Sequence, residues 1–299
     1  MSRSIAPSLM PLLHHHLGGP ILEATPLSGG DISDVYRLRT GRGDCVLKAS
    51  RRALPHLFFA EAQDLGLLRE AALRRPAGLL VPDVIAYGDA PGGWQYLLQS
   101  YLPPVAETSQ GYEAQSQEAL GRGLAALHSA MVPGFGGTAD NYFGMLPQFN
   151  PPFQSAADFF WNARLQPQLR LAQEHLSGED TDRFEALRQR LPGLIPTEPP
   201  SLVHGDMWHG NLLYTAAGPA LIDPAAAYSH REVDLAAMKL FGGVPERVFD
   251  AYAEAFPPAP GWQDRANLWN LYPLLAHVNM FGSGYLGRTR ATLNTVLNL

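Results

Sequence analysis

Short apolar runs separated by turn residues dominate the first hundred positions of the chain, a pattern that predicts a β-sheet. Strand-like composition occurs in four runs: 35–38, 45–48, 84–87 and 96–99. The first two runs flank glycines at 41 and 43, which indicates a hairpin. Apolar positions then recur at helical spacing from Leu57 to Leu68, and Pro76 or Gly78 should end that helix.

Helical periodicity replaces the strand pattern after Pro103 and Pro104, which cannot continue a helix or a central strand. Apolar helical segments are expected at 120–131, 159–169, 184–191 and 271–279. We therefore predict an α+β protein with two lobes. Residues 1–102 would form an N-terminal lobe with an antiparallel sheet and one main helix. Residues 103–299 would form a larger, mainly helical C-terminal lobe.

The N-terminal apolar stretch does not predict a membrane segment. It runs from Ile5 to Leu13, contains Pro7 and Pro11, and is too short to span a bilayer. The three histidines at 14–16 are expected in a solvated loop, because three adjacent side chains cannot all reach one metal ion from regular structure. We expect a cytoplasmic protein with no membrane partner.

Composition narrows the function classes further. The 299 residues carry a formal net charge of −6, which disfavours nucleic acid as a partner because binding to a phosphate backbone needs a basic excess. Cys45 is the only cysteine, so an intrachain disulfide and a thiolate metal cluster are excluded. Lys48 and Lys239 are the only lysines. Lys48 ends a predicted strand, where an ammonium can present a compact charge to phosphate.

A polar loop between two short apolar strands carries the strongest chemical signal. It lies within residues 202–213, and a further apolar run ends at Asp223. Asp206 and Asn211 are five residues apart, which is the spacing of the catalytic carboxylate and the metal-binding amide in kinase catalytic loops. Asp223 supplies the second hard oxygen ligand that magnesium bridging ATP phosphates requires. The pattern predicts a base at Asp206 and a Mg²⁺ site at Asn211 and Asp223.

The other parts of an ATP site occur upstream, in the order that kinases have. A loop with Gly29, Gly30 and Ser33 precedes one strand, Lys48 lies on the next strand, and Glu61 lies on the following helix. Glycines let backbone amides approach phosphates, and a Lys–Glu pair orients the lysine toward them. Taken alone, the two glycines would more often form a plain turn, but the order of the parts indicates ATP binding.

Several motifs of this chain resemble those of the fructosamine (ketosamine) kinases. They are His204-Gly205-Asp206-x-Trp208-x-x-Asn211 and the segments 222–225, 231–236, 240–243, 279–286, 141–144 and 147–148. The resemblance runs from about Ser28 to Leu286, which is nearly the whole chain. It implies a two-lobed protein-kinase-like fold, with ATP and Mg²⁺ as cofactors. The acceptor would be a ketosamine, the adduct formed when a sugar rearranges on an amine.

The resemblance also implies roles for individual residues. Lys48 would pair with Glu61, Asp206 would be the base, and Asn211 and Asp223 would hold magnesium. The strand end with Gln99 and Tyr101 would form the hinge that binds adenine. Trp208 would face the sugar; the alternative is a core tryptophan beneath the loop, because indoles are common core anchors.

Other polar residues near these motifs have structural interpretations. Asp234 is expected to accept backbone hydrogen bonds from the catalytic loop, and His204 is also assigned a structural role. His277 and Asn279 lie on an apparent apolar helix. They are either a hydrogen-bonded core pair or part of a substrate-pocket wall.

Differences from protein kinases favour a small acceptor. Ser33 stands where protein kinases carry the last glycine of the phosphate loop, and Gly205 replaces the arginine that usually precedes the catalytic aspartate. Ten residues separate Asp223 from Asp234, which is too few for a peptide-docking activation segment. The acceptor is therefore a small molecule or a small group displayed on a protein.

The leading hypothesis is transfer of the ATP γ-phosphate to the 3-hydroxyl of a fructosamine or ribulosamine, leading to deglycation. The acceptor would be a free ketosamine or a glycated lysine on a protein. An aminoglycoside or choline-type kinase of the same fold is the alternative, and by resemblance the motifs at 232–236 and 281–285 oppose it. An inactive kinase-like binding module is a minor alternative, opposed by the presence of Lys48, Asp206, Asn211 and Asp223. The sequence does not distinguish a monomer from a homodimer.

Overall fold

The computed structural model describes residues 4–27, 33–52, 54–106, 112–130 and 132–299. Gly29 and Gly30 of the expected phosphate loop lie outside the described residues. Ser33 is the first described residue after them. No helix among the described residues has the length and apolar character needed to cross a bilayer.

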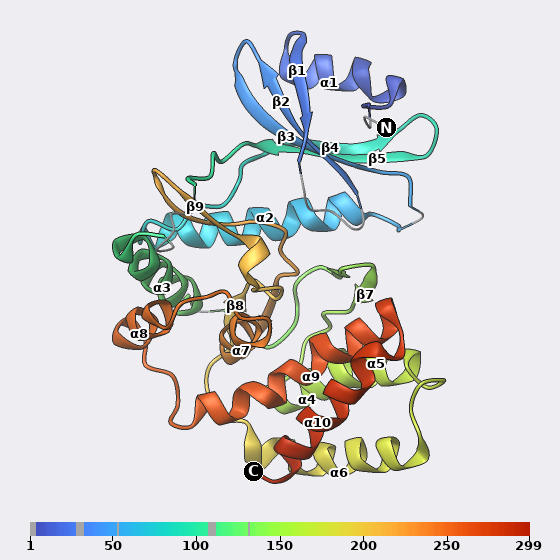
Figure 1. Ribbon diagram of the computed structural model, residues 1–299, viewed down its shortest axis with the longest axis vertical. Helices are drawn as coiled ribbons and strands as arrows, with labels where there is room; N and C mark the ends of the chain where they lie inside the picture. Colours follow the sequence, from blue (N-terminus) through green and yellow to red (C-terminus); the bar gives the residue numbers. More distant parts are fainter. Residues whose placement is uncertain (1–3, 28–32, 53, 107–111, 131) are drawn as a thin grey trace.

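In the described part of the N-terminal lobe, five antiparallel strands in the order β1-β2-β3-β5-β4 form one sheet (Figure 1). The strands are β1 (Ile21–Pro26), β2 (Asp34–Thr40), β3 (Gly43–Ser50), β4 (Val84–Ala90) and β5 (Trp94–Ser100). Helix α1 (Met10–Leu17) packs on one face of the sheet, and α2 (Leu57–Arg74) packs on the other. The four predicted strands and the predicted helix α2 are thus confirmed.

The alternation of side chains along the strands decides which residues face α2. Lys48 pairs with Val35 and Leu97, and Val46 pairs with Gln99. Paired residues project to the same face of a sheet. Leu97 packs into the core shared with α2, so Lys48, Val46 and Gln99 also project to the α2 face.

Helix α1 and strand β1 were not predicted, and the expectation of a solvated loop at residues 14–16 is wrong. The three histidines lie in α1, with exposed side chains, and His16 Nε2 lies 2.9 Å from the hydroxyl of Tyr96. Pro7 and Pro11 do not break this segment, because they occupy the first turns of a short 3-10 helix and of α1. Proline is tolerated there, since those N–H groups have no partner within the helix.

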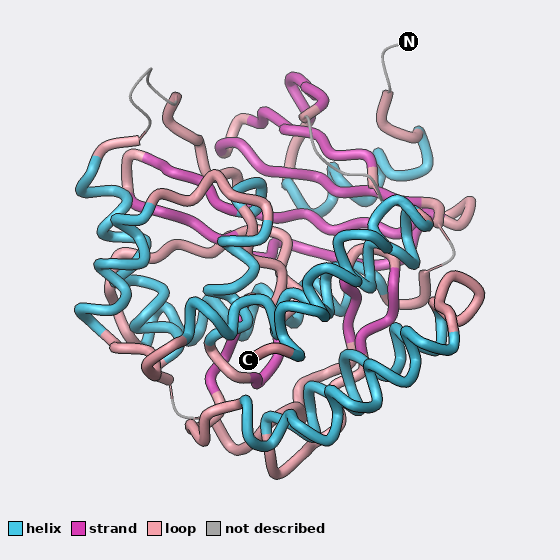
Figure 2. Tube along the Cα trace, turned by 60° about the horizontal axis from the view of Figure 1, so that its bottom comes forward, coloured by secondary structure: helices cyan, strands magenta, loops and turns pink. Residues whose placement is uncertain are grey.

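The C-terminal lobe is mainly helical, as predicted (Figure 2). Its described residues also form three two-stranded ladders. Its main helices are α3 (Ala114–His128), α4 (Ala156–Phe159), α5 (Gln166–Leu171), α6 (Gly178–Leu194), α7 (Glu232–Leu240), α8 (Glu246–Ala255), α9 (Trp262–Phe281) and α10 (Leu286–Leu297). A π-helical stretch, Phe160–Leu165, joins α4 to α5. The ladders are β6 (Asn141–Phe143) with β7 (Leu146–Gln148), β8 (Ser201–Val203) with β11 (Ala227–Ser229), and β9 (Leu212–Thr215) with β10 (Gly218–Leu221).

One hydrophobic core joins α2 to the C-terminal lobe. Leu65 of α2 packs in the same cluster as Leu124 of α3, Leu212 of β9 and Leu235 of α7. Although α2 lies within residues 1–102, this core holds it against the elements that carry the catalytic loop. The division between residues 102 and 103 stays a prediction.

Candidate active site

The loop after β8 brings Asp206 and Asn211 into contact. Gly205 has a φ of +83°, and a Cβ there would lie 2.0 Å from the carbonyl oxygen of Ala225. Glycine is therefore required where protein kinases carry an arginine. Asn211 then donates from Nδ2 to the Asp206 backbone oxygen at 2.8 Å and to its carboxylate Oδ2 at 3.1 Å. These bonds fix the carboxylate on the loop.

The environment of Asp206 suits a proton acceptor at neutral pH. Burial raises the pKa of its carboxyl to about 7, the hydrogen bond from Asn211 lowers it, and the negative charges of Asp223 and Asp234 raise it. General bases work best when their pKa lies near the operating pH. The side chain is partly exposed and lines a cavity of about 220 Å³ together with Lys48 and Asn211.

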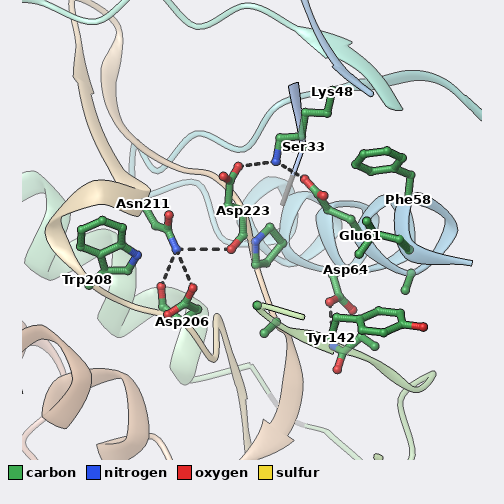
Figure 3. A pocket seen from close by; sticks show the side chains of 16 residues that line it. Ser33, Lys48, Phe58, Glu61, Asp64, Tyr142, Asp206, Trp208, Asn211 and Asp223 are labelled. Atoms are coloured by element: carbon green, nitrogen blue, oxygen red, sulfur yellow. Dashed lines mark hydrogen bonds and ion pairs between the residues drawn. The ribbon is translucent and has the colours of Figure 1, made fainter. Parts of the chain in front are cut away.

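Lys48 lies between two carboxylates in the cleft (Figure 3). Its Nζ donates to Asp223 Oδ1 at 2.5 Å and also pairs with Glu61 of α2. Burial alone would lower the pKa of Lys48, but the charges of Asp223 and Glu61 raise it above its usual value. The ammonium is therefore retained and is held between the Glu61 and Asp223 carboxylates.

The oxygen donors of Asn211 and Asp223 fit a Mg²⁺ ion. Asn211 uses Nδ2 for its hydrogen bonds to Asp206, which leaves its amide oxygen as a ligand. Asp223 adds a carboxylate beside the same cavity. Mg²⁺ in kinase-type sites takes one or two such protein oxygens and completes its shell with phosphate oxygens and water.

A cavity of about 510 Å³ lies between the sheet and the β9–β10 ladder. Its lining includes Val46, Lys48, Gln99, Tyr101 and Asp223. Gln99 is 3% exposed, and its Oε1 has no hydrogen-bond partner among the described residues. The Tyr101 ring is held in the wall by Arg37, whose guanidinium lies 4.5 Å from the ring centroid. The expected hinge residues thus border the same cavity as Lys48.

A second cavity, of about 310 Å³, is also lined by Trp208. Its wall is largely aromatic and sulfur-containing, and comprises Phe143, Met145, Trp208, Phe241, His277, Met280, Phe281 and Tyr285, with Gly144 and Asp206. Trp208 lines both large cavities and the space around Asp206. It is a cleft residue, unlike a core tryptophan.

His277 and Asn279 lie in different environments in the structure. The ring Nδ1 of His277 donates to the Pro273 carbonyl at 2.6 Å, and burial lowers the pKa of the imidazole. His277 therefore lines the aromatic cavity as a neutral ring. Asn279 donates to the backbone oxygen and to Oε1 of Gln168, so it belongs to the packing between α5 and α9.

The Asp234 carboxylate holds the start of the loop that carries Asp206 and Asn211. Its carboxylate accepts the backbone N–H groups of His204 at 2.7 Å and Gly205 at 2.9 Å. His128 Nε2 lies 3.1 Å from Asp234. His204 Nε2 donates to the carbonyl of Ile222 at 2.9 Å, so it links this loop to the segment that ends at Asp223.

The sequence interpretation missed Asp64, a buried carboxylate beside the site. It lies on α2 three residues after Glu61, below it in Figure 3, and lines the cavity that also contains Asp206 and Asp223. Burial raises the pKa of Asp64 to about 8, while hydrogen bonds from Asn141 and Ala226 lower it. The sequence could have indicated Asp64 by its spacing from Glu61, because residues three apart lie on the same face of a helix.

Proteins of known families resemble this chain over nearly its full length. The family model described as fructosamine kinase matches residues 6–299. A Vibrio parahaemolyticus protein named a probable ketoamine kinase is 34% identical over 283 residues, which cover 93% of each chain. A Thermus thermophilus protein with the same name is 37% identical over 273 residues, which cover 88% of this chain and 90% of that one.

Solved structures show the same architecture. A candidate fructosamine-3-kinase from Thermobifida fusca superimposes with a TM-score of 0.87 at 33% identity, covering 99% of this chain and 100% of that one. An aminoglycoside phosphotransferase solved with AMP-PNP and hygromycin B has a TM-score of 0.64 at 18% identity, covering 96% and 98% of the two chains. The second likeness shows the fold alone. Together these neighbours confirm the expected two-lobed, kinase-like α+β fold.

Proposed function

Because this chain belongs to the fructosamine kinase family, we propose that it transfers the γ-phosphate of ATP to the 3-hydroxyl of a ketosamine. The position of Asp206 carries this proposal. It lines the aromatic cavity and also the cavity of about 220 Å³ whose lining includes Lys48 and Asp223. A base at that junction can accept the proton of an acceptor hydroxyl as the hydroxyl oxygen attacks the phosphate.

ATP is the proposed donor, on two grounds. Solved neighbours with the same fold hold AMP-PNP or ADP. In this chain Gln99 and Tyr101 line the larger cavity together with Lys48 and Asp223. A base bound between the end of β5 and the β9–β10 ladder would place the phosphates of the nucleotide beside Lys48 and Asp223.

The phosphate end of the cleft would be organised by Lys48, Asn211 and Asp223. Lys48 would turn from Asp223 toward the phosphates while Glu61 keeps its ammonium in place. Asn211 and Asp223 would hold Mg²⁺, which neutralises charge on the transferring phosphoryl group when it is bound. The Asn211 bonds to Asp206 hold the metal ligand and the base in a fixed relation.

The aromatic cavity favours a ketosamine over an aminoglycoside. Asp206 is the only acidic residue among the described residues that line it. An aminoglycoside carries several ammonium groups and would need several carboxylates to replace their hydration. A sugar with one amine substituent suits Trp208 and its neighbouring rings, which can hold apolar carbon and attract a single cation.

The inactive binding module is disfavoured by the contacts in the cleft. Lys48 pairs with both Glu61 and Asp223, and Asn211 holds Asp206. A module that only bound a ligand would have no need of this arrangement.

We propose that the acceptor is a free ketosamine or a glycated lysine, and that the cytoplasm is the location.

We expect a fructose- or ribulose-derived lysine adduct to be phosphorylated with a kcat/KM at least ~10²-fold above that for choline or an aminoglycoside, because a site built for one substrate's polar groups rejects analogues that lack them. Initial rates of ADP formation with each acceptor measure this. The same adduct without its 3-hydroxyl is the matched control and should give no turnover. Efficient use of choline or an aminoglycoside, with no ketosamine turnover, would contradict the proposal.

A further inference from the structure

The backbone at Asp223 is held in an unusual conformation. Its φ is +56°, and Asp223 is one of two residues other than glycine with a positive φ in the described chain. Left-handed backbone is unfavourable for a residue with a side chain, and it persists where the surrounding structure holds it.

Buried side chains from α2 and β6 hold the backbone three residues after Asp223. Asp64 Oδ2 accepts the N–H of Ala226 at 3.0 Å and Nδ2 of Asn141 at 2.7 Å. Nδ2 of Asn141 also donates to the carbonyl of Ala226 at 2.8 Å. Both backbone polar groups of Ala226 are therefore bonded by side chains from elements distant in sequence.

Gln148 of β7 extends this network to Ala225. Its Nε2 donates to the Ala225 carbonyl at 3.1 Å and to Asn141 Oδ1 at 2.8 Å. The hydroxyl of Tyr272 donates to Gln148 Oε1 at 2.8 Å. Asp64, Asn141 and Gln148 are each at most 3% exposed, so water cannot readily replace these bonds.

We infer that Asp64, Asn141 and Gln148 are positioning residues that lock the Ala225–Ala226 backbone and thereby aim the carboxylate of Asp223 at the metal site. We call these three residues the Ala226 clamp. The inference rests on the proposed role of Asp223 as a magnesium ligand. It also gives a role to Asn141 and Gln148, which the catalytic assignment leaves unused.

The contacts of Asp64 indicate that it acts as a hydrogen-bond acceptor. It receives two N–H groups through one oxygen. No lysine, arginine or histidine among the described residues forms an ion pair with it. An amide oxygen accepts the same bonds as a carboxylate oxygen. Asparagine should therefore replace Asp64, whereas leucine, of similar size but without an acceptor, should not.

The test is calorimetric binding of AMP-PNP to the full chain over a series of Mg²⁺ concentrations, a measurement that needs no turnover. Asp64→Leu and Asn141→Ala should each raise the half-saturating Mg²⁺ concentration by ~10–100-fold, the usual effect of removing a partner that orients a metal ligand. Asp64→Asn should stay within about threefold of wild type, because it keeps the acceptor oxygen.

Asp180→Ala is the matched control for general destabilisation. Asp180 is also buried, and it caps α6 and pairs with Arg290 far from the cleft. The Asp180→Ala substitution should lower the melting temperature without changing the half-saturating Mg²⁺ concentration. If Asp64→Leu does not fold, Gln148→Leu replaces it, since that variant keeps Asp64 and Asn141.

Two results separate the inference from the proposed function. If wild type binds AMP-PNP without any Mg²⁺ dependence, the metal role of Asp223 is wrong and the clamp has no purpose. If wild type depends on Mg²⁺ and the folded clamp variants keep the same half-saturating concentration, the clamp is overturned while the proposed function stands. An equal shift in Asp180→Ala would also overturn it.

Discussion

Asp206→Asn is expected to lower kcat by about 10²–10⁴-fold, the range for loss of a general base. The amide keeps the size of the carboxylate but cannot accept the proton of the acceptor hydroxyl. Nucleotide affinity should change little, because Lys48, Asn211 and Asp223 all remain. Steady-state kinetics together with AMP-PNP titration measure both quantities. A variant that keeps more than about a third of wild-type activity would exclude Asp206 as the base.

The pH dependence of kcat/KM is a second test of Asp206 as the base. Since burial raises the pKa of Asp206 to about 7, the base is increasingly protonated as the pH falls through that value. Wild-type kcat/KM should therefore decline on the acid side of neutrality. The residual activity of Asp206→Asn should not show this decline.

Lys48→Arg is expected to lower kcat/KM by about 10²-fold although the charge is kept, a scale associated with misplacing a reacting group by about 1 Å. Lys48 is 5% exposed and its ammonium lies between Glu61 and Asp223. The longer, planar guanidinium cannot reproduce a point contact in that space. Rates measured at saturating and limiting ATP separate loss of nucleotide binding from loss of the chemical step.

Lys239→Arg is the matched control, since Lys239 is the other lysine of the chain. Its Nζ lies 3.5 Å from Glu246 and 4.7 Å from the centroid of the Phe249 ring, on the partly exposed face of α7. Arginine can make both contacts, so this variant should behave as wild type. Equal losses in the two variants would contradict the role of Lys48.

The part of the site that lies close together in sequence was the part that could be predicted. Asp206, Asn211 and Asp223 fall within one strand-loop-strand unit, so their spacing alone predicted their contact. Lys48 and Glu61 occupy adjacent elements, and the order of those elements predicted their pairing. Roles for these five residues stay predictions, whereas their proximity is a feature of the structure.

The part assembled from distant segments could not be predicted. The Ala226 clamp joins α2, β6 and β7 to the end of the loop after Asp223, and no spacing in the sequence reports such contacts. The aromatic cavity likewise combines Trp208 with Phe241 and Phe281; among its α9 residues the sequence indicated only His277 for a substrate-pocket wall, and then as one of two alternatives. Periodicity identified those helices but gave no information on which ends meet.

The measurement that tests the central claim most directly is phosphorus NMR of a ketosamine incubated with the protein, ATP and Mg²⁺, with free amine assayed in parallel. We predict a sugar 3-phosphate signal first and release of the amine afterwards. Enolisation of the ketone toward the amine-bearing carbon lets the phosphate at the 3-position leave as inorganic phosphate. Water then hydrolyses the resulting imine, which frees the amine without a second catalytic site. A sugar phosphate at another position, or ATP consumed with no sugar phosphate formed, would contradict the account.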